Sequence, residues 1–354
     1  MKILIIECGA HEQIINYFYE IFNDFSDEIT ILGKQQRKSW FPKEIHSKAN
    51  LVLSKPQDFW LKAAELSKTK EHIIFFTPPE YSGTNSKKFM IGFLWYVLRH
   101  RNKITLLIRN TNLWLLEKNK KPSLNNLIRF CTHKVLRNRK AFEYSQISKN
   151  LITENEKFAV LPISYWNDNK IQFKEKLNIC FSGRVNYEIR DLETFFMALN
   201  YLDTDTLATI SFYVSSPMNH KEQAKLLNDL NNVANIFFNQ NWDQYLNIIK
   251  TSHLMFAPLV NNKKYGITKG TGSFGDALYT NRKVIIPRFV CEDNEFDGVA
   301  YYYQSAEELA EIFRLAVINY RQNNANFFTI DQIARQSFSK ENIYSNFLMF
   351  VQGK

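Results

Sequence analysis

The stretch KYGITKGTGSFGDALYTNRKVIIP, residues 264–287, decides the fold that this sequence predicts. It begins as a loop rich in glycine and small hydroxyl residues, continues into an amphipathic segment, and ends in a short apolar run. Another apolar run, HLMFAPLV at residues 253–260, comes directly before it. Strand, loop, helix and strand in this order form the repeating unit of a parallel sheet covered by helices.

The same unit recurs on both sides of this stretch. In the first half we expect strands at 2–8, 28–33, 72–78, 104–110, 151–155 and 157–163, with helices at 12–25 and 87–101. In the second half we expect strands at 176–183, 209–216, 235–240, 253–260 and 283–289, and helices at 191–202, 221–233, 243–252, 306–322 and 340–352. The predicted class is α/β, with two successive Rossmann-like domains.

A polar linker at residues 162–176 separates the two series, and we place the domains at 1–165 and 166–354. Their charges differ. The first carries 26 Lys and Arg against 15 Asp and Glu, and the second carries 19 against 20. A basic half joined to a neutral half indicates two domains with different binding partners.

Composition narrows the class of protein. A hydrophobic content of 45% excludes a disordered chain. The four cysteines, Cys8, Cys131, Cys180 and Cys291, are scattered without metal-ligand spacing, which predicts free thiols in a reducing compartment. The opening residues MKILIIECGAHEQ show no signal-peptide pattern, so we expect a cytoplasmic protein.

The glycine-rich loop has what an anion site requires. Gly270 and Gly272 let the backbone approach a ligand, and Lys269 adds a positive charge. The free amides of Thr271 and Ser273 at the start of the helix would point at an anion. The loop has neither the Walker A nor the GxGxxG spacing. The alternative is an ordinary loop in which Ser273 caps the helix.

A second candidate for the same site follows the strand KLNICFSG. This strand ends in Gly183 and Arg184, and Arg190 lies six residues further, just before a helix. Two arginines at this point can hold a diphosphate. The alternative is a pair of surface arginines.

The runs CFSGRVNYEIRDLETFFMALNYL (180–202), NIFFNQNWDQYLNIIKTSHLMFAPLV (235–260) and GDALYTNRKVIIP (275–287) together resemble glycosyltransferases of the GT-B fold, in particular the group 1 or family 4 C-terminal domain, over about residues 177–350. The resemblance implies two Rossmann-like domains facing each other across a cleft, with the C-terminal helix crossing back to the first. It implies a nucleoside-diphosphate sugar held by the second domain and an acceptor held by the first. No cofactor and no metal ion are expected.

The sequence departs from the family pattern at four places. Arg190 stands one place later than the family's diphosphate lysine. Of the family's two glutamates, the one expected on the donor ribose corresponds to Asp276, and the other corresponds to Thr268. Arg109 and Asn110 stand where the retaining branch has a histidine. Retaining and inverting chemistry therefore both stay open.

An inverting reaction needs a base in the first domain. Three residues follow predicted strands there: His11, Glu12 and Glu80. The alternatives are an exposed loop acid for Glu80 and helix-terminal residues for the other two. The sequence Asp203-Thr204-Asp205 has the DxD form of a metal site, but it lies at the end of the sheet opposite the ligand crevice. We interpret it as a solvated turn.

The basic half carries two segments suited to a surface. Residues 89–98 are apolar but too short to span a bilayer, and we expect a buried helix. Residues 118–140 contain eight Lys and Arg and no acid, interleaved with apolar residues that include Leu124, Leu127, Ile128 and Phe130. This pattern suits an anionic membrane surface, and a merely solvated face is the alternative. Nucleic acid would be attracted as well, but no nucleic-acid-binding motif accompanies the charge.

The sequence therefore predicts a metal-independent glycosyltransferase of the hexosyltransferase type. It would act on a glycan or lipid-linked acceptor in bacterial-type surface polysaccharide or glycoconjugate synthesis, at the inner face of the membrane. The alternatives are a nucleotide-sugar epimerase or a glycosyl phosphorylase of the same architecture, and, less favoured, a nucleic-acid-binding protein.

Overall fold

The structure is a computed structural model that describes most of the 354 residues. The described residues are 1–9, 15–79, 86–108, 123–136, 140–143, 159–161, 164–173, 175–183, 185, 187–216, 224–225, 228–229, 234–238, 242–261, 271–290 and 296–352. The chain divides into two compact units. The first comprises residues 1–163, 267–270 and 340–354, and the second comprises 164–266 and 271–339.

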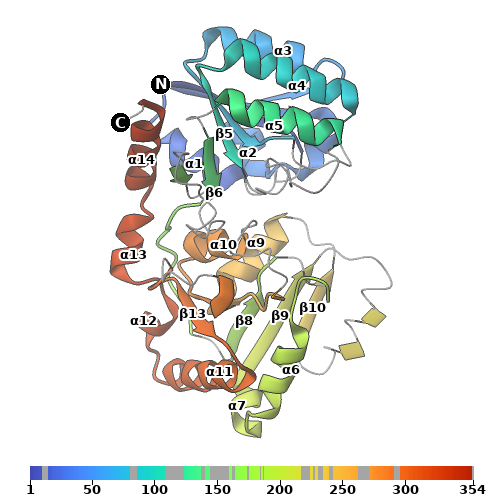
Figure 1. The fold of residues 1–354 in the computed structure, drawn as a ribbon. Helices are drawn as coiled ribbons and strands as arrows, with labels where there is room; N and C mark the ends of the chain where they lie inside the picture. Colours follow the sequence, from blue (N-terminus) through green and yellow to red (C-terminus); the bar gives the residue numbers. More distant parts are fainter. Residues whose placement is uncertain are drawn as a thin grey trace. The chain divides into compact units, whose positions relative to one another are not determined.

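The first unit contains a seven-stranded sheet in the order β3-β2-β1-β4-β5-β6-β7, and every neighbouring pair is parallel (Figure 1). The order reverses between β1 and β4. The strands are β1 (Lys2–Glu7), β2 (Glu28–Lys34), β3 (Asn50–Ser54), β4 (His72–Thr77), β5 (Ile104–Ile108), β6 (Lys140–Glu143) and β7 (Ala159–Leu161).

Helices cover both faces of this sheet. On one face α3 (Phe59–Leu66), α4 (Lys87–His100) and α5 (Leu124–Leu136) enclose a core around Trp60, Phe75 and Phe93. On the other face α1 (Ile15–Asn23) meets the C-terminal helix α14 (Lys340–Gln352), where the rings of Phe22 and Phe347 lie 4.9 Å apart. The short helices η2 (Gln35–Trp40), α2 (Lys43–Lys48) and η3 (Ser67–Thr69) complete the unit. The C-terminal helix therefore belongs to the first unit, as predicted.

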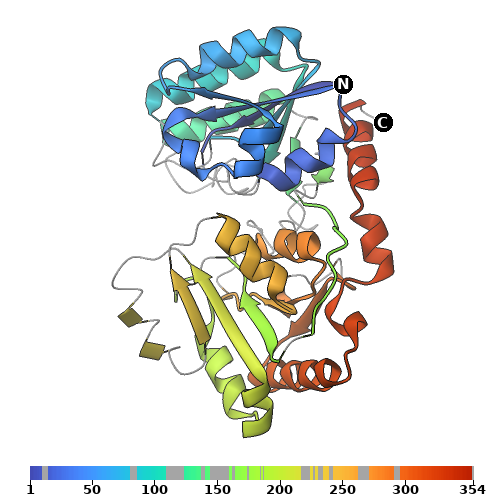
Figure 2. The ribbon, with the colours of Figure 1, turned by 180° about the vertical axis from the view of Figure 1, so that it is seen from behind.

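The second unit repeats the plan with six parallel strands in the order β10-β9-β8-β11-β12-β13 (Figure 2). Here the order reverses between β8 and β11. The strands are β8 (Leu177–Phe181), β9 (Ile210–Ser216), β10 (Ala234–Phe238), β11 (Leu254–Phe256), β12 (Val284–Pro287) and β13 (Ala300–Tyr303).

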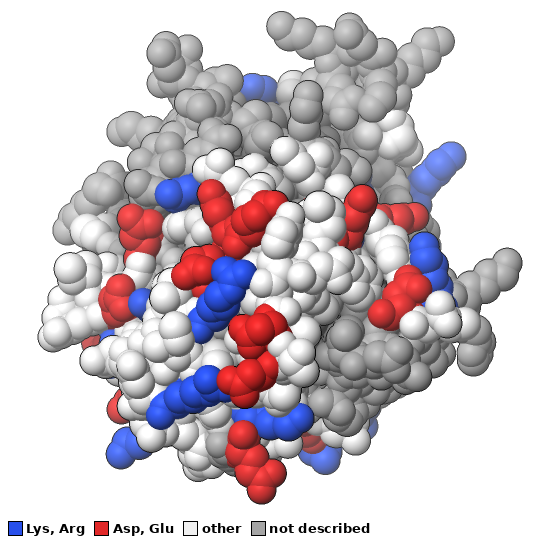
Figure 3. Space-filling model, turned by 90° about the horizontal axis from the view of Figure 1, so that it is seen from below, with Lys and Arg blue, Asp and Glu red and all other residues white. Residues whose placement is uncertain are grey.

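Aromatic residues fill the core of this unit. Phe181, Phe195, Phe212, Phe256 and Phe313 are buried together between one face of the sheet and the helices α6 (Leu192–Asn200) and α11 (Ala306–Arg321). The other helices of the unit are α7 (Thr204–Thr209), α9 (Trp242–Thr251), α10 (Ser273–Thr280), η7 (Arg288–Val290), α12 (Ala325–Phe328) and α13 (Gln332–Ser337). Seen from the side on which α7 and α11 lie, the described surface of the second unit mixes both signs of charge (Figure 3).

The predicted α/β class with two Rossmann-like parallel sheets is confirmed, and most predicted strands are found within a few residues of their expected bounds. The sequence pattern gave no indication of β3, β6 or β13, which are only four or five residues long and lie at or near sheet edges. The strand predicted at 151–155 and most of the helix predicted at 221–233 lie outside the described residues.

Candidate functional site

The site that we consider lies where the strand order of the second sheet reverses. In open parallel sheets, ligands bind outside the carboxyl ends of the two strands that flank such a point. Here these strands are β8 and β11. The chain leaves β8 through Ser182 and then turns at Gly183, whose φ of 77° is left-handed. A side chain would be strained at that φ, so the glycine is required by the turn.

The start of α10 lies against this turn. Gly272 occupies the N-cap position and Ser273 is the first helical residue, so the predicted Ser273 cap is wrong by one residue. The hydroxyls of Thr271 and Ser273 lie 3.0 Å apart, and Ser273 Oγ lies 3.5 Å from the carbonyl oxygen of Ser182. Among the described residues, no atom lies within 4 Å of a Cβ added to Gly272, so these residues leave the space in front of the helix start open.

A buried carboxylate joins the turn to the helix. Asp276, 5% exposed, accepts hydrogen bonds through Oδ2 from Ser182 Oγ at 2.6 Å and from the Tyr245 hydroxyl at 2.5 Å. The amide of Gly183 donates in turn to the Tyr245 oxygen at 3.3 Å. Because α9 supplies Tyr245 and α10 supplies Asp276, this network sets the position of the β8 turn relative to both helices.

Burial and this charge together raise the pKa values of two neighbouring groups. Burial, followed by the Asp276 charge, holds the pKa of Tyr245 well above its usual range. The same two causes, burial first, raise the pKa of the Cys180 thiol to about 12. Both groups are therefore neutral near pH 7, and Tyr245 keeps the hydrogen that it donates to Asp276.

The structure places Arg190 behind the β8 turn. Its side chain is 5% exposed, and Nη2 donates to the carbonyl oxygen of Ser182. A Cβ on Gly183 would lie 3.1 Å from the same nitrogen. Arg190 also pairs with Leu259, beyond β11, in an isolated antiparallel bridge. The guanidinium thus supports the turn from the protein side.

Of the residues predicted for the donor site, the structure brings together five: Gly183, Arg190, Thr271, Ser273 and Asp276. A sixth, Gly272, lies between Thr271 and Ser273 in the sequence. Arg184, Lys269 and Gly270 lie outside the described residues, as do Thr268, Arg109 and Asn110. The three predicted bases, His11, Glu12 and Glu80, also lie outside them. Sequence reasoning missed Tyr245, because a tyrosine in an amphipathic helix gives no functional signal.

The corresponding point of the first sheet carries a second buried carboxylate that sequence reasoning missed. Glu7 ends β1 and is fully buried, and its Oε1 accepts a hydrogen bond of 2.7 Å from the amide of Gly9. Beyond β4, the Arg129 side chain on α5 is 1% exposed and donates through Nε to the Pro79 carbonyl at 2.8 Å. The signal for Glu7 was one acid at the end of an otherwise apolar strand.

The DxD sequence forms the start of a helix where we had expected a solvated turn. Asp203 caps α7 by accepting from the Thr206 amide at 2.7 Å, and Asp205 pairs with Arg321 at 2.7 Å. Both carboxylates therefore have structural partners. Among the residues that the structure describes, no cluster of His, Cys, Asp and Glu has the arrangement of a metal site.

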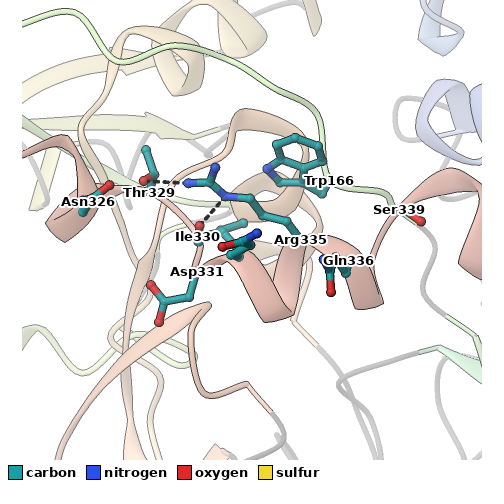
Figure 4. Close-up of a pocket in the computed structure, with 9 residues that line it drawn as sticks. Trp166, Asn326, Thr329, Ile330, Asp331, Arg335, Gln336 and Ser339 are labelled. Carbon is teal, nitrogen blue, oxygen red and sulfur yellow. Dashed lines mark hydrogen bonds between the residues drawn. The ribbon is translucent and has the colours of Figure 1, made fainter.

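A cavity of about 620 Å³ in the second unit lies elsewhere (Figure 4). Trp166 and the segment from α12 to α13 line it. Arg335 Nε donates to the Ile330 carbonyl at 2.6 Å and Nη2 donates to Thr329 Oγ1 at 3.0 Å. The guanidinium carbon lies 5.6 Å from the Trp166 ring. Because these contacts already engage the arginine, and because the lining residues come from Trp166 and the segment 326–339 and not from a described strand, we do not assign the ligand site to this cavity.

No protein-family model and no curated protein sequence matches this chain. Solved structures do match over the whole chain. The Anabaena protein HepE in complex with UDP-glucose has a TM-score of 0.65 at 10% identity, covering 100% of both chains. An α-glucosyltransferase in complex with UDP and a DNA 13-mer has a TM-score of 0.65 at 12% identity, covering 99% of this chain and 100% of that one.

The chain has the GT-B fold. A UDP-GlcNAc 2-epimerase from Neisseria meningitidis bound to UDP-GlcNAc also matches, with a TM-score of 0.55 and 11% identity over 100% of both chains. At these identities the likeness concerns the fold alone. The GT-B fold is thus shared by transferase and epimerase structures, and the function has to be argued from the site.

Proposed function

We propose that this chain is a glycosyltransferase that moves a sugar from a nucleoside-diphosphate sugar to a glycan or lipid-linked acceptor. The proposal includes transfer of a hexose without a metal ion, in the synthesis of a surface polysaccharide or glycoconjugate. The place of action that we propose is the cytoplasmic face of a membrane.

One observation carries the proposal: the β8 turn and the start of α10 meet at the switch point of the second sheet. Gly183 gives the turn its left-handed backbone, and no atom of the described residues lies within 4 Å of the place that a Gly272 side chain would take. Backbone amides at a helix start attract a diphosphate through hydrogen bonds and the helix dipole. The matched structures that contain UDP-glucose or UDP support a ligand of this chemical class.

The roles divide between residues that touch the donor and residues that position it. Arg184, Lys269 and the amides of residues 270–273 are proposed to bind the diphosphate directly. The contacts of Arg190 support a positioning role for it, because its guanidinium holds the Ser182 carbonyl from behind. Asp276 stays our candidate for the donor ribose, and its bonds to Ser182 and Tyr245 give it a positioning role as well.

The first unit is proposed to bind the acceptor and to supply the base. If the reaction inverts configuration, one of Glu80, Glu12 or His11 takes the proton of the acceptor hydroxyl as that oxygen attacks the donor sugar, and the nucleoside diphosphate leaves. Glu7 would act through its bond to Gly9, which fixes the backbone directly after β1.

A nucleotide-sugar epimerase is the second candidate, favoured by the likeness to a UDP-GlcNAc 2-epimerase. The two functions predict different products. A transferase moves the sugar to another molecule, whereas an epimerase returns an altered nucleotide sugar without any acceptor. A glycosyl phosphorylase would need phosphate and no nucleotide.

The first experiment is thermal stabilisation of the full chain by UDP, GDP and a panel of nucleoside-diphosphate sugars, with inorganic phosphate and duplex DNA as comparisons. We expect stabilisation by one nucleoside diphosphate and its sugar. The stabilising donor is then incubated with and without glycan and lipid-linked acceptors, and the products are analysed by mass spectrometry. Stabilisation by DNA alone, or an isomerised donor formed without acceptor, would overturn the transferase proposal.

A further inference from the structure

The outer faces of α4 and α5 carry apolar side chains that the fold leaves uncovered. On α4, Ile91, Trp95 and Leu98 are 57%, 45% and 49% exposed, at the spacing of one helical face. On α5, Leu124 and Leu127 are each 44% exposed. The two helices pack against each other, so both stripes belong to one side of the first unit. We call these five side chains the α4–α5 stripe.

The core holds the opposite sides of the two helices. Met90, Phe93 and Val97 on α4 are fully buried, and Ile128 and Leu136 on α5 are nearly so. The expectation that residues 89–98 form a buried helix is therefore correct for one side only. The expectation that Ile128 faces a membrane is wrong, because Ile128 packs in the core with α4 and β5.

The charge around this stripe is positive. Residues 81–142 contain 14 Lys and Arg and one acid, Glu117. The helices α4 and α5 contain no Asp or Glu. Exposed cations flank the stripe at Lys87, Lys88, Arg99, Arg101 and Lys134. The end of the second unit seen in Figure 3 instead carries both signs of charge in mixture.

We propose that the α4–α5 stripe and its flanking cations dock the first unit onto an anionic lipid bilayer. Apolar and aromatic side chains flanked by Lys and Arg are the composition of interfacial helices, which bury one face among lipid headgroups. The Arg99 guanidinium lies 5.5 Å from the Trp95 ring centre, so the ring can enter the interface while the charge stays with the headgroups.

A nucleic acid fits this surface less well. Phosphates would pair with the same cations, but the backbone of a duplex offers nothing apolar to cover Ile91, Trp95 and Leu98. A lipid surface satisfies the charge and the exposed apolar area together. Within the part of the chain that the structure describes, no helix has the length and apolar character needed to cross a bilayer. The contact that we propose is peripheral.

This inference adds a docking surface to the proposed function, but it rests only on residues of the first unit. Its test uses co-sedimentation of the full chain with phosphatidylcholine vesicles, with or without phosphatidylglycerol, across a salt series. We expect binding to the anionic vesicles only, weakening as salt rises and leaving a salt-resistant remainder. The single substitutions Lys88→Gln and Arg99→Gln each remove one positive charge. Each should weaken binding to the anionic vesicles about fivefold.

Removing the apolar part tests the stripe itself. The double variant Ile91→Ser/Trp95→Ser should lose the salt-resistant remainder, whereas Ile318→Ser on α11, where the side chain is equally exposed in the second unit, should not. Lys170→Gln is the matched charge control. A fluorophore on Cys131, which is exposed on α5 in line with Leu124 and Leu127, should report an apolar environment on adding anionic vesicles. A Cys291→Ser background removes the one thiol outside the described residues.

Equal binding to both vesicle types, or full binding by the Ile91→Ser/Trp95→Ser variant, would overturn the proposal. A stable dimer that shields Cys131 from labelling in the absence of lipid would also overturn the proposal. A competition experiment in which the chain binds DNA and does not bind vesicles would do the same. Nucleotide binding is measured in parallel for every variant. Because the stripe shares no residue with the proposed donor site, an inactive donor site and a failed docking surface give separate results.

Discussion

The Ser182 hydroxyl donates a hydrogen bond of 2.6 Å to Asp276 Oδ2, although 94 residues separate the two in the sequence. Ser182 follows β8, and Asp276 lies in the first turn of α10. Tyr245, from α9, donates to the same oxygen. Three elements that the chain forms separately are therefore fixed to one another at the point where a donor would bind.

Tyr245→Phe tests this network. The change removes one hydrogen bond to a buried carboxylate and the acceptor for the Gly183 amide, so we expect the free energy of unfolding to fall by about 1.5–3 kcal/mol. Nucleotide affinity should fall with it. Tyr201→Phe is the control, because its hydroxyl also donates to a carboxylate, Glu307, but at the exposed surface. Chemical denaturation of both variants measures the difference. Equal losses of stability in the two variants would show that the buried network contributes no more than an exposed hydrogen bond.

Much of this arrangement could be predicted from the sequence. Apolar runs alternating with amphipathic helices predicted both sheets, and glycines after strands predicted the two loops of the candidate site. The short strands β3, β6 and β13 gave too few residues for a pattern, since an edge strand needs only a few paired backbone groups. The Ser182–Asp276 bond could not be predicted, because it depends on tertiary packing between segments whose spacing in sequence carries no information.

Substitutions at the two glycines of the candidate site, Gly272 and Gly183, should have different effects on stability and on nucleotide binding. Gly272→Val places a side chain where no atom of the described residues lies within 4 Å, so we expect only a small fall in melting temperature, from the less favourable N-cap residue, and a large loss of nucleotide binding. Gly183→Ala forces a side chain into a φ of 77° and against Arg190, which should cost about 1–2 kcal/mol of stability. Thermal denaturation and nucleotide titration of both variants separate the effects. Nucleotide binding that survives Gly272→Val would place the donor elsewhere.

Arg184 and Lys269 are the proposed cationic contacts of the diphosphate. Each Ala variant removes a charge-assisted hydrogen bond of roughly 1.5–3 kcal/mol, so affinity for the nucleoside diphosphate should fall about ten- to a hundredfold. Lys170→Ala is the control, because Lys170 is an exposed lysine of the second unit and has no place in the proposed donor site. Calorimetric titration measures the affinities. Unchanged binding in both variants, with the fold intact by circular dichroism, would remove these residues from the donor site.

The base of an inverting reaction should be one of Glu80, Glu12 and His11. The Ala variant of the true base should lose about 100- to 10 000-fold in kcat, while the affinity for the donor persists. Glu20→Ala, a partly buried acid of α1, serves as the comparison for a change without a catalytic role. Steady-state kinetics with the identified donor and acceptor measure kcat. Full activity in all three variants would mean that the base lies elsewhere or that the reaction retains configuration without one.

The thiol of Cys180 predicts how stability depends on alkaline pH. Its ordinary pKa is 9.0, and burial, followed by the charge of Asp276, raises the pKa in the folded chain to about 12. Below pH 9 the Cys180 thiol holds its proton in both the folded and the unfolded chain. Its full contribution to the free energy of unfolding is then present. Between the two values the unfolded chain loses a proton that the folded chain keeps, so unfolding becomes more favourable as pH rises, by about 1.4 kcal/mol per pH unit.

Chemical denaturation of the wild type and Cys180→Ala at a series of pH values from neutral to strongly alkaline measures this slope. Other groups also titrate in this range, but they do so in both proteins, so the difference between the two curves isolates the thiol. We expect the wild type to lose its advantage over Cys180→Ala progressively above pH 9, and the variant to show a shallower decline. Parallel curves over the whole range would contradict the raised pKa. They would also imply that the environment shared by Cys180, Tyr245 and Asp276 is more hydrated than their burial indicates.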